Sequence, residues 1–92
     1  MNEQAESIFE LAKDAHRAMR MDPASAKSVI ESARQKIEQA ADAAKSARNP
    51  SLAAFTARAI GYLDSMATHA RYQGAFAGGL AALERRLVDV AE

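Results

Sequence analysis

Residues 26–47, AKSVIESARQKIEQAADAAKSA, carry small and aliphatic side chains at alternating spacings of four and three residues. We call this ladder the alanine seam; its members are Ala26, Ile30, Ala33, Ile37, Ala40, Ala44 and Ala47. Heptad spacing keeps these side chains on one side of a helix, and alanine allows a neighbouring backbone to approach closely. Because alanine removes little apolar surface from water, this helix is expected to depend on a partner helix, inside the chain or outside it.

Two proline dipeptides, Asp22-Pro23 and Asn49-Pro50, frame the alanine seam. Asp and Asn are preferred N-cap residues, and proline is favoured at the first position of a helix. A residue that precedes proline is also disfavoured in the α conformation, so each dipeptide ends the helix before it. The sequence therefore predicts helices over about residues 3–20 and 23–48, with a third helix that begins near residue 50.

The second half of the chain is more apolar and predicts two further helices, over residues 50–71 and 75–91. A break near residues 72–75 separates them, and Gly78 and Gly79 lie inside the later ladder of apolar residues. The alternative is one long helix over residues 50–91 that is kinked at these glycines. Short junctions favour antiparallel neighbours. We therefore expect a single all-α domain over residues 1–92, built of antiparallel helical hairpins as a small three- or four-helix bundle.

Composition limits the core and the classes of partner. The chain has 92 residues and no cysteine, and 23 of its apolar residues are alanine, so the core is thin and a homodimer or higher oligomer is expected. Twelve basic residues balance twelve acidic ones, which disfavours nucleic acid as a partner. The acidic N-terminus and the short apolar runs predict neither a signal peptide nor a membrane span, and hence a cytoplasmic protein.

Aromatic and imidazole side chains recur every seven residues at Phe55, Tyr62, His69 and Phe76. Such a strip is typical of a helix core, but it can also line an interface or a ligand pocket. Together with nearby residues it forms our candidate interface or ligand pocket, whose members are Phe55, Arg58, Tyr62, Met66, His69, Arg71, Tyr72 and Phe76.

The sequence predicts no catalytic residue, metal site or cofactor. Each histidine lies three residues from a methionine, His16 with Met19 and His69 with Met66, which is compatible with a soft-metal site. Core packing is the favoured interpretation of these pairs, because methionine is a common filler of cores. Serines occur on helices without a nucleophile elbow or a phosphate loop. Arg85 and Arg86 are expected to pair locally with acidic neighbours. The alternative is a positive edge that meets an acidic partner or a phosphate, formed by Lys45, Arg48, Arg58, Arg71, Arg85 and Arg86.

These features favour a non-enzymatic helical protein that binds a protein partner as an adaptor, regulator or inhibitor. Small alanine-rich helical proteins without cysteine are frequent among phage and mobile-element products that act on host machinery, so such an origin is one expectation. The first alternative is an oligomer that binds a small ligand or nucleotide in a pocket at the subunit seam. The second alternative is a regulator that binds DNA.

Overall fold

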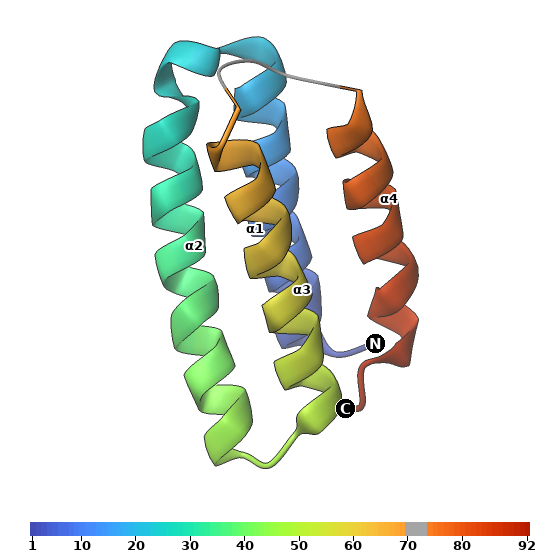
Figure 1. Ribbon diagram of the computed structural model, residues 1–92. Coiled ribbons are helices and arrows are strands. Elements are labelled where there is room, and N and C mark those ends of the chain that lie inside the picture. The colour runs from blue at the N-terminus through green and yellow to red at the C-terminus, as the bar shows by residue number, and fades with distance from the viewer. Residues whose placement is uncertain (70–73) are drawn as a thin grey trace.

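Each Asx-Pro dipeptide lies where one helix gives way to the next, and the described part of the chain folds as four packed helices (Figure 1). The computed structural model describes residues 1–69 and 74–92. The helices are α1 (Glu3–Met21), α2 (Pro23–Ser46), α3 (Pro50–Ala67) and α4 (Ala75–Arg86), followed by a short 3-10 turn, η1 (Leu87–Asp89). Helix α4 packs on α1 and α3. The expected all-helical bundle is confirmed.

The helix ends differ from the expected bounds for local reasons. Helix α2 ends at Ser46 because a C-terminal cap follows it, and α3 ends at Ala67. Helix α4 ends at Arg86, where the chain tightens into η1 instead of continuing to residue 91. Helices α3 and α4 are separate, so the alternative of one long kinked helix is wrong, whereas Gly78 and Gly79 do lie inside α4. Residues 70–73, which include the expected end of the third helix, lie outside the described residues.

The alanine seam forms the inner face of α2, which packs against α1 and α3. The seam members Ala26, Ile30, Ala33, Ile37 and Ala44 are buried. Ala40 is only half-buried, and Ala47 is exposed because α2 ends before it. Ala47 is therefore wrongly placed in the seam. The remaining core comes mostly from α1 and α3, whose buried alanines let the helices approach one another.

A Schellman motif ends α2 with a residue other than glycine in the left-handed conformation. Arg48 has φ of 54°, and its N–H donates to the carbonyl of Lys45 at 3.1 Å. The next N–H, that of Asn49, donates to the carbonyl of Ala44 at 3.0 Å. This is the hydrogen-bond pattern that normally places glycine where Arg48 stands. The tight α2–α3 junction is thus formed with backbone strain at Arg48.

Replacing Arg48 with glycine should raise the free energy of unfolding by about 0.5–1 kcal/mol, because relief of left-handed strain exceeds the added entropy of the unfolded chain. Chemical denaturation measures this gain. Arg48→Ala is the matched control: it removes the same side chain but keeps a Cβ, so it should show no gain. Equal gains in both variants would assign the effect to the arginine side chain and not to the backbone.

The two asparagine N-caps also hold the C-terminal end of the chain. The side-chain carbonyls of Asn2 and Asn49 accept from the first turns of α1 and α3, at Ala5 and Leu52. Their side-chain amides both donate to the carbonyl of Ala91, at 2.8 Å and 3.1 Å. The starts of α1 and α3 and the end of the chain therefore meet at one end of the bundle, and this contact positions the residues just after α4 (Figure 1).

A surface ion-pair network joins α2 to α3. The Arg34 guanidinium donates to the Asp64 carboxylate from Nε at 2.7 Å and also pairs with Glu38 one turn along α2. The Arg34 side chain lowers the pKa of Asp64 below its ordinary value through this hydrogen bond. Because the groups are well exposed, the network contributes little to stability. The network bridges the surface of the α2–α3 contact.

In the described ranges, no helix combines the length and the apolar character that crossing a membrane requires.

Candidate functional site

The heptad strip of aromatic residues lies mainly in the core. Phe55, Tyr62, Met66 and Phe76 are buried, with exposed fractions of 2%, 9%, 0% and 4%. His69 is half-buried, and its ring lies edge-on to Phe76 with the ring centres 5.2 Å apart. Most of the strip is therefore placed to hold α4 on α3. Two further members of the candidate pocket, Arg71 and Tyr72, lie outside the described residues.

The hydroxyl of Tyr62 joins three helices at the centre of this strip. It donates to the carbonyl of Phe76 at 2.9 Å, and it lies 2.8 Å from Nδ1 of His16. A hydroxyl has one proton, and here the Phe76 carbonyl accepts it, so Nδ1 of His16 carries a proton and donates to Tyr62. This chain of hydrogen bonds connects α1, α3 and the first turn of α4 through buried groups.

His16 is a buried histidine beside three basic side chains of α1. Its exposed fraction is 8%, and the cavity beside it is lined by Lys13, Arg17 and Arg20. Burial lowers the pKa of His16 below its ordinary value of 6.5, and the charge of Arg20 lowers it further. The folded protein therefore favours the neutral ring.

Stability should decrease as the pH falls below about 6.5, because the unfolded chain then binds a proton that folded His16 resists. Above that pH, neutral His16 makes its full contribution to the free energy of unfolding. His16→Gln keeps a side-chain N–H donor without a titrating ring, so its unfolding free energy should vary less between pH 7 and pH 5.5. Urea titrations at closely spaced pH values measure the slopes. Identical slopes in wild type and His16→Gln would contradict the prediction.

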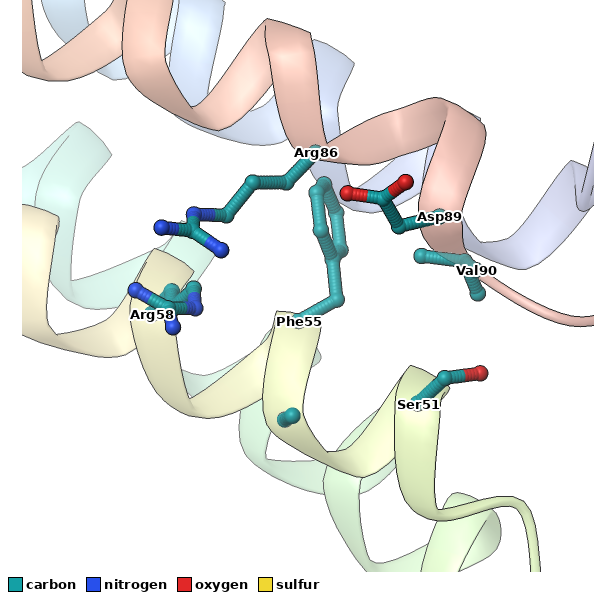
Figure 2. A pocket seen from close by; sticks show the side chains of 7 residues that line it. Ser51, Phe55, Arg58, Arg86, Asp89 and Val90 are labelled. Atoms are coloured by element: carbon teal, nitrogen blue, oxygen red, sulfur yellow. The ribbon is translucent and has the colours of Figure 1, made fainter.

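A second group of residues forms an open cavity of about 150 Å³ between α3 and the end of α4 (Figure 2). Its apolar wall includes Phe55 and Val90, both mostly buried. Figure 2 shows Phe55 rising from α3, with the Arg86 guanidinium on one side of its ring and the Asp89 carboxylate on the other. The complete lining is Ser51, Ala54, Phe55, Arg58, Arg86, Asp89 and Val90. We call this cavity the arginine pocket.

Two guanidinium groups reach the arginine pocket from different helices. Arg58 extends from α3 and Arg86 from α4, and both groups lie on the same side of Phe55 (Figure 2). Within residues 1–69 and 74–92, neither arginine forms an ion pair. The expected local pairing of Arg85 and Arg86 with acidic neighbours is likewise wrong for the described chain. Two like charges beside an apolar wall favour an anionic group between them.

The sequence gave Arg58 and Phe55 as candidate site residues and Arg86 only as part of an alternative positive edge. Asp89 and Val90 were not among the candidates. Arg86 and Arg58 are far apart in the chain, and only the packing of α4 on α3 brings them to one cavity. The other candidates separate in space, since His69 lines a different cavity and Tyr62 is a core residue. The feature of the sequence that could have indicated the arginine pocket was the set of arginines in its second half.

Comparison of the chain with family models, curated proteins and solved structures finds no match.

Proposed function

We propose that this protein is a non-enzymatic binding protein, and that its arginine pocket receives an acidic side chain of a partner protein. The observation that carries the proposal is that Arg58 and Arg86 flank an apolar wall without forming an ion pair in the described part of the chain. Planar guanidinium groups bind carboxylates through two parallel hydrogen bonds. An incoming Glu or Asp would supply the missing counter-charge.

The size of the pocket supports a side chain over a larger ligand. Its volume of about 150 Å³ corresponds to roughly five water molecules at about 30 Å³ each. Pockets for drug-sized ligands span about 300–1,000 Å³, so a nucleotide would extend well outside this one. The Asp89 carboxylate at the other end of the pocket can accept from a backbone N–H or a basic neighbour of the bound acid. This arrangement favours a peptide whose acidic residue is its anchor.

The proposal extends to the finer architecture, in which antiparallel helical hairpins associate as a homodimer or higher oligomer. The meeting of the starts of α1 and α3 with Ala91 supports the hairpin arrangement. In the described ranges the exposed large apolar side chains are Met1, Met21 and Val88. Since only these three are large and apolar, the interface with a second copy would consist mostly of small and polar side chains of the described residues. Light scattering at micromolar concentration tests this association, and a strictly monomeric species would contradict it.

Selection of a random peptide-display library on the immobilised protein tests the binding function without assuming any particular partner. We expect the selected peptides to share a Glu or Asp. The double variant Arg58→Gln/Arg86→Gln should weaken their binding by about 30- to 100-fold, which corresponds to about 2–3 kcal/mol for two charge-assisted contacts. Fluorescence anisotropy at several salt concentrations measures this loss.

Arg85→Gln is the matched control, because Arg85 lies next to Arg86 on α4 but does not line the pocket. It should change the affinity less than threefold. Thermal melting of each variant verifies that the fold is retained. Selected peptides without an acidic residue, or equal losses in the control and the double variant, would overturn the assignment of the arginine pocket.

A further inference from the structure

Of the two methionine–histidine pairs expected from the sequence, the fold keeps Met66 with His69 and separates Met19 from His16. Met19, Met66 and His69 line one cavity of about 210 Å³. It lies where α1 ends, α2 begins and α3 ends, at the end of the bundle away from Ala91 (Figure 1). His16, which the sequence placed with Met19, instead bonds to Tyr62. We propose that this cavity is a site for a soft monovalent metal ion, Cu(I), with the two methionine sulfurs and Nε2 of His69 as ligands.

The hydrogen bonds of His69 leave the correct nitrogen available to a metal. Nδ1 lies 2.7 Å from the backbone carbonyl of Ser65, and a carbonyl only accepts, so Nδ1 carries the proton. In the neutral ring the lone pair is then on Nε2. Histidines that bind metals commonly donate their other ring N–H to a backbone carbonyl in this way, which fixes both the tautomer and the ring orientation. The edge contact with Phe76 further restrains the ring.

The chemistry of the ligand set selects the ion. Thioether sulfur is a soft ligand that binds Cu(I) and is a poor ligand for calcium, magnesium and other hard cations. Met66 and Met19 have exposed fractions of 0% and 3%, so both thioethers are held away from water. In the described ranges, no group of three His, Cys, Asp or Glu side chains could hold a metal ion. A harder divalent ion would therefore find no comparable set of ligands there.

The rim of the cavity is compatible with a single positive charge. Lys27 and Glu31 lie one turn apart in the N-terminal half of α2 and contribute opposite charges to the lining. A monovalent ion bound by three neutral ligands adds only one charge to this balanced surface. This site is separate from the arginine pocket, whose lining shares no residue with it, so either assignment can fail alone.

Titration with Ag(I), a redox-stable probe for Cu(I), tests the proposal on the full chain labelled with ¹³C at the methionine methyl groups. We expect one equivalent to shift the methyl signals of Met19 and Met66, whereas those of the exposed Met1 and Met21 stay in place. Cu(I) affinity is then measured by competition with a coloured Cu(I) chelator. His69→Gln and the volume-conserving pair Met19→Leu/Met66→Leu should each weaken binding at least tenfold.

The matched controls are His16→Gln and Met21→Leu, which leave the three proposed ligands intact and should keep the wild-type affinity. His69→Gln changes a half-buried ring, so it tests the site even if the double methionine variant fails to fold. Absence of a shift at one equivalent, equal shifts at all four methionines, or unchanged Cu(I) affinity in His69→Gln would each overturn the assignment.

Discussion

Alanine at the two neighbouring glycines of α4 should change stability in opposite directions, with Gly78→Ala stabilising the protein and Gly79→Ala destabilising it. At Gly78, a Cβ would have no atom within 4 Å, so the better helix propensity of alanine should add about 1 kcal/mol. At Gly79, a Cβ would lie 2.8 Å from Cδ1 of Tyr62. The Tyr62 ring cannot move aside freely, because its hydroxyl is bonded to His16 and to the Phe76 carbonyl.

The resulting overpacking at Gly79 should cost about 3 kcal/mol, which exceeds the gain in helix propensity and leaves a net loss of about 2 kcal/mol. The two variants differ only in the position of one methyl group, and their unfolding free energies should differ by about 3 kcal/mol. Thermal and chemical denaturation measure this difference. Gly79→Ala combined with Tyr62→Leu, which removes the clashing ring, should recover part of the loss relative to Tyr62→Leu alone. Stabilisation by Gly79→Ala in the wild-type background would show that α4 does not depend on close approach to Tyr62.

Leucine at Ala33, in the middle of the alanine seam, should lower the free energy of unfolding by about 3 kcal/mol. Ala33 is 3% exposed on the face of α2 that packs against α1 and α3, so the larger side chain forces these helices apart. For a domain of this size, such a loss lowers Tm by about 15 °C. Differential scanning calorimetry measures the change.

Ala47→Leu is the matched control, because Ala47 has the same place in the heptad pattern but is exposed after the end of α2. It should change stability by less than about 0.5 kcal/mol. Similar losses at Ala33 and Ala47 would mean that Ala47 packs against another surface, such as a second copy of the chain. A neutral Ala33→Leu would contradict the close packing of α2.

The proposed binding of an acidic side chain depends on the packing of α4 against α3, because α4 carries Arg86. Helix α4 is held against α3 at both of its ends. Near its start, the Tyr62 hydroxyl bonds to the Phe76 carbonyl. Beyond its end, the N–H of Ala91 donates to the Ser51 hydroxyl at 2.8 Å. Ser51 is itself part of the lining of the arginine pocket. The spacing of the two guanidinium groups is therefore coupled to how firmly the C-terminal end is held.

Local chemistry accounts for most of the helices that the sequence predicted. Asn49 and Pro50 begin α3 as expected, since the Asn49 side chain accepts from Leu52 and proline occupies the first turn. The heptad spacing likewise predicted the buried face of α2 through Ile37. These features depend on residues within one or two turns of each other, and such short-range patterns are readable in a single sequence.

Contacts between distant residues were not predictable in this way. Arg34 pairs with Asp64, and Arg58 meets Arg86 at one pocket, because α3 packs beside α2 on one side and α4 on the other. The helical patterns specify an apolar face for each helix, but several arrangements of four such faces bury similar areas. The choice among them depends on specific contacts such as Gly79 against Tyr62. Such contacts depend on how the shapes of the side chains fit together, which the spacing of apolar residues in the sequence does not specify. The chain thus encodes its helices locally, whereas the pairing of side chains into sites follows from how those helices pack.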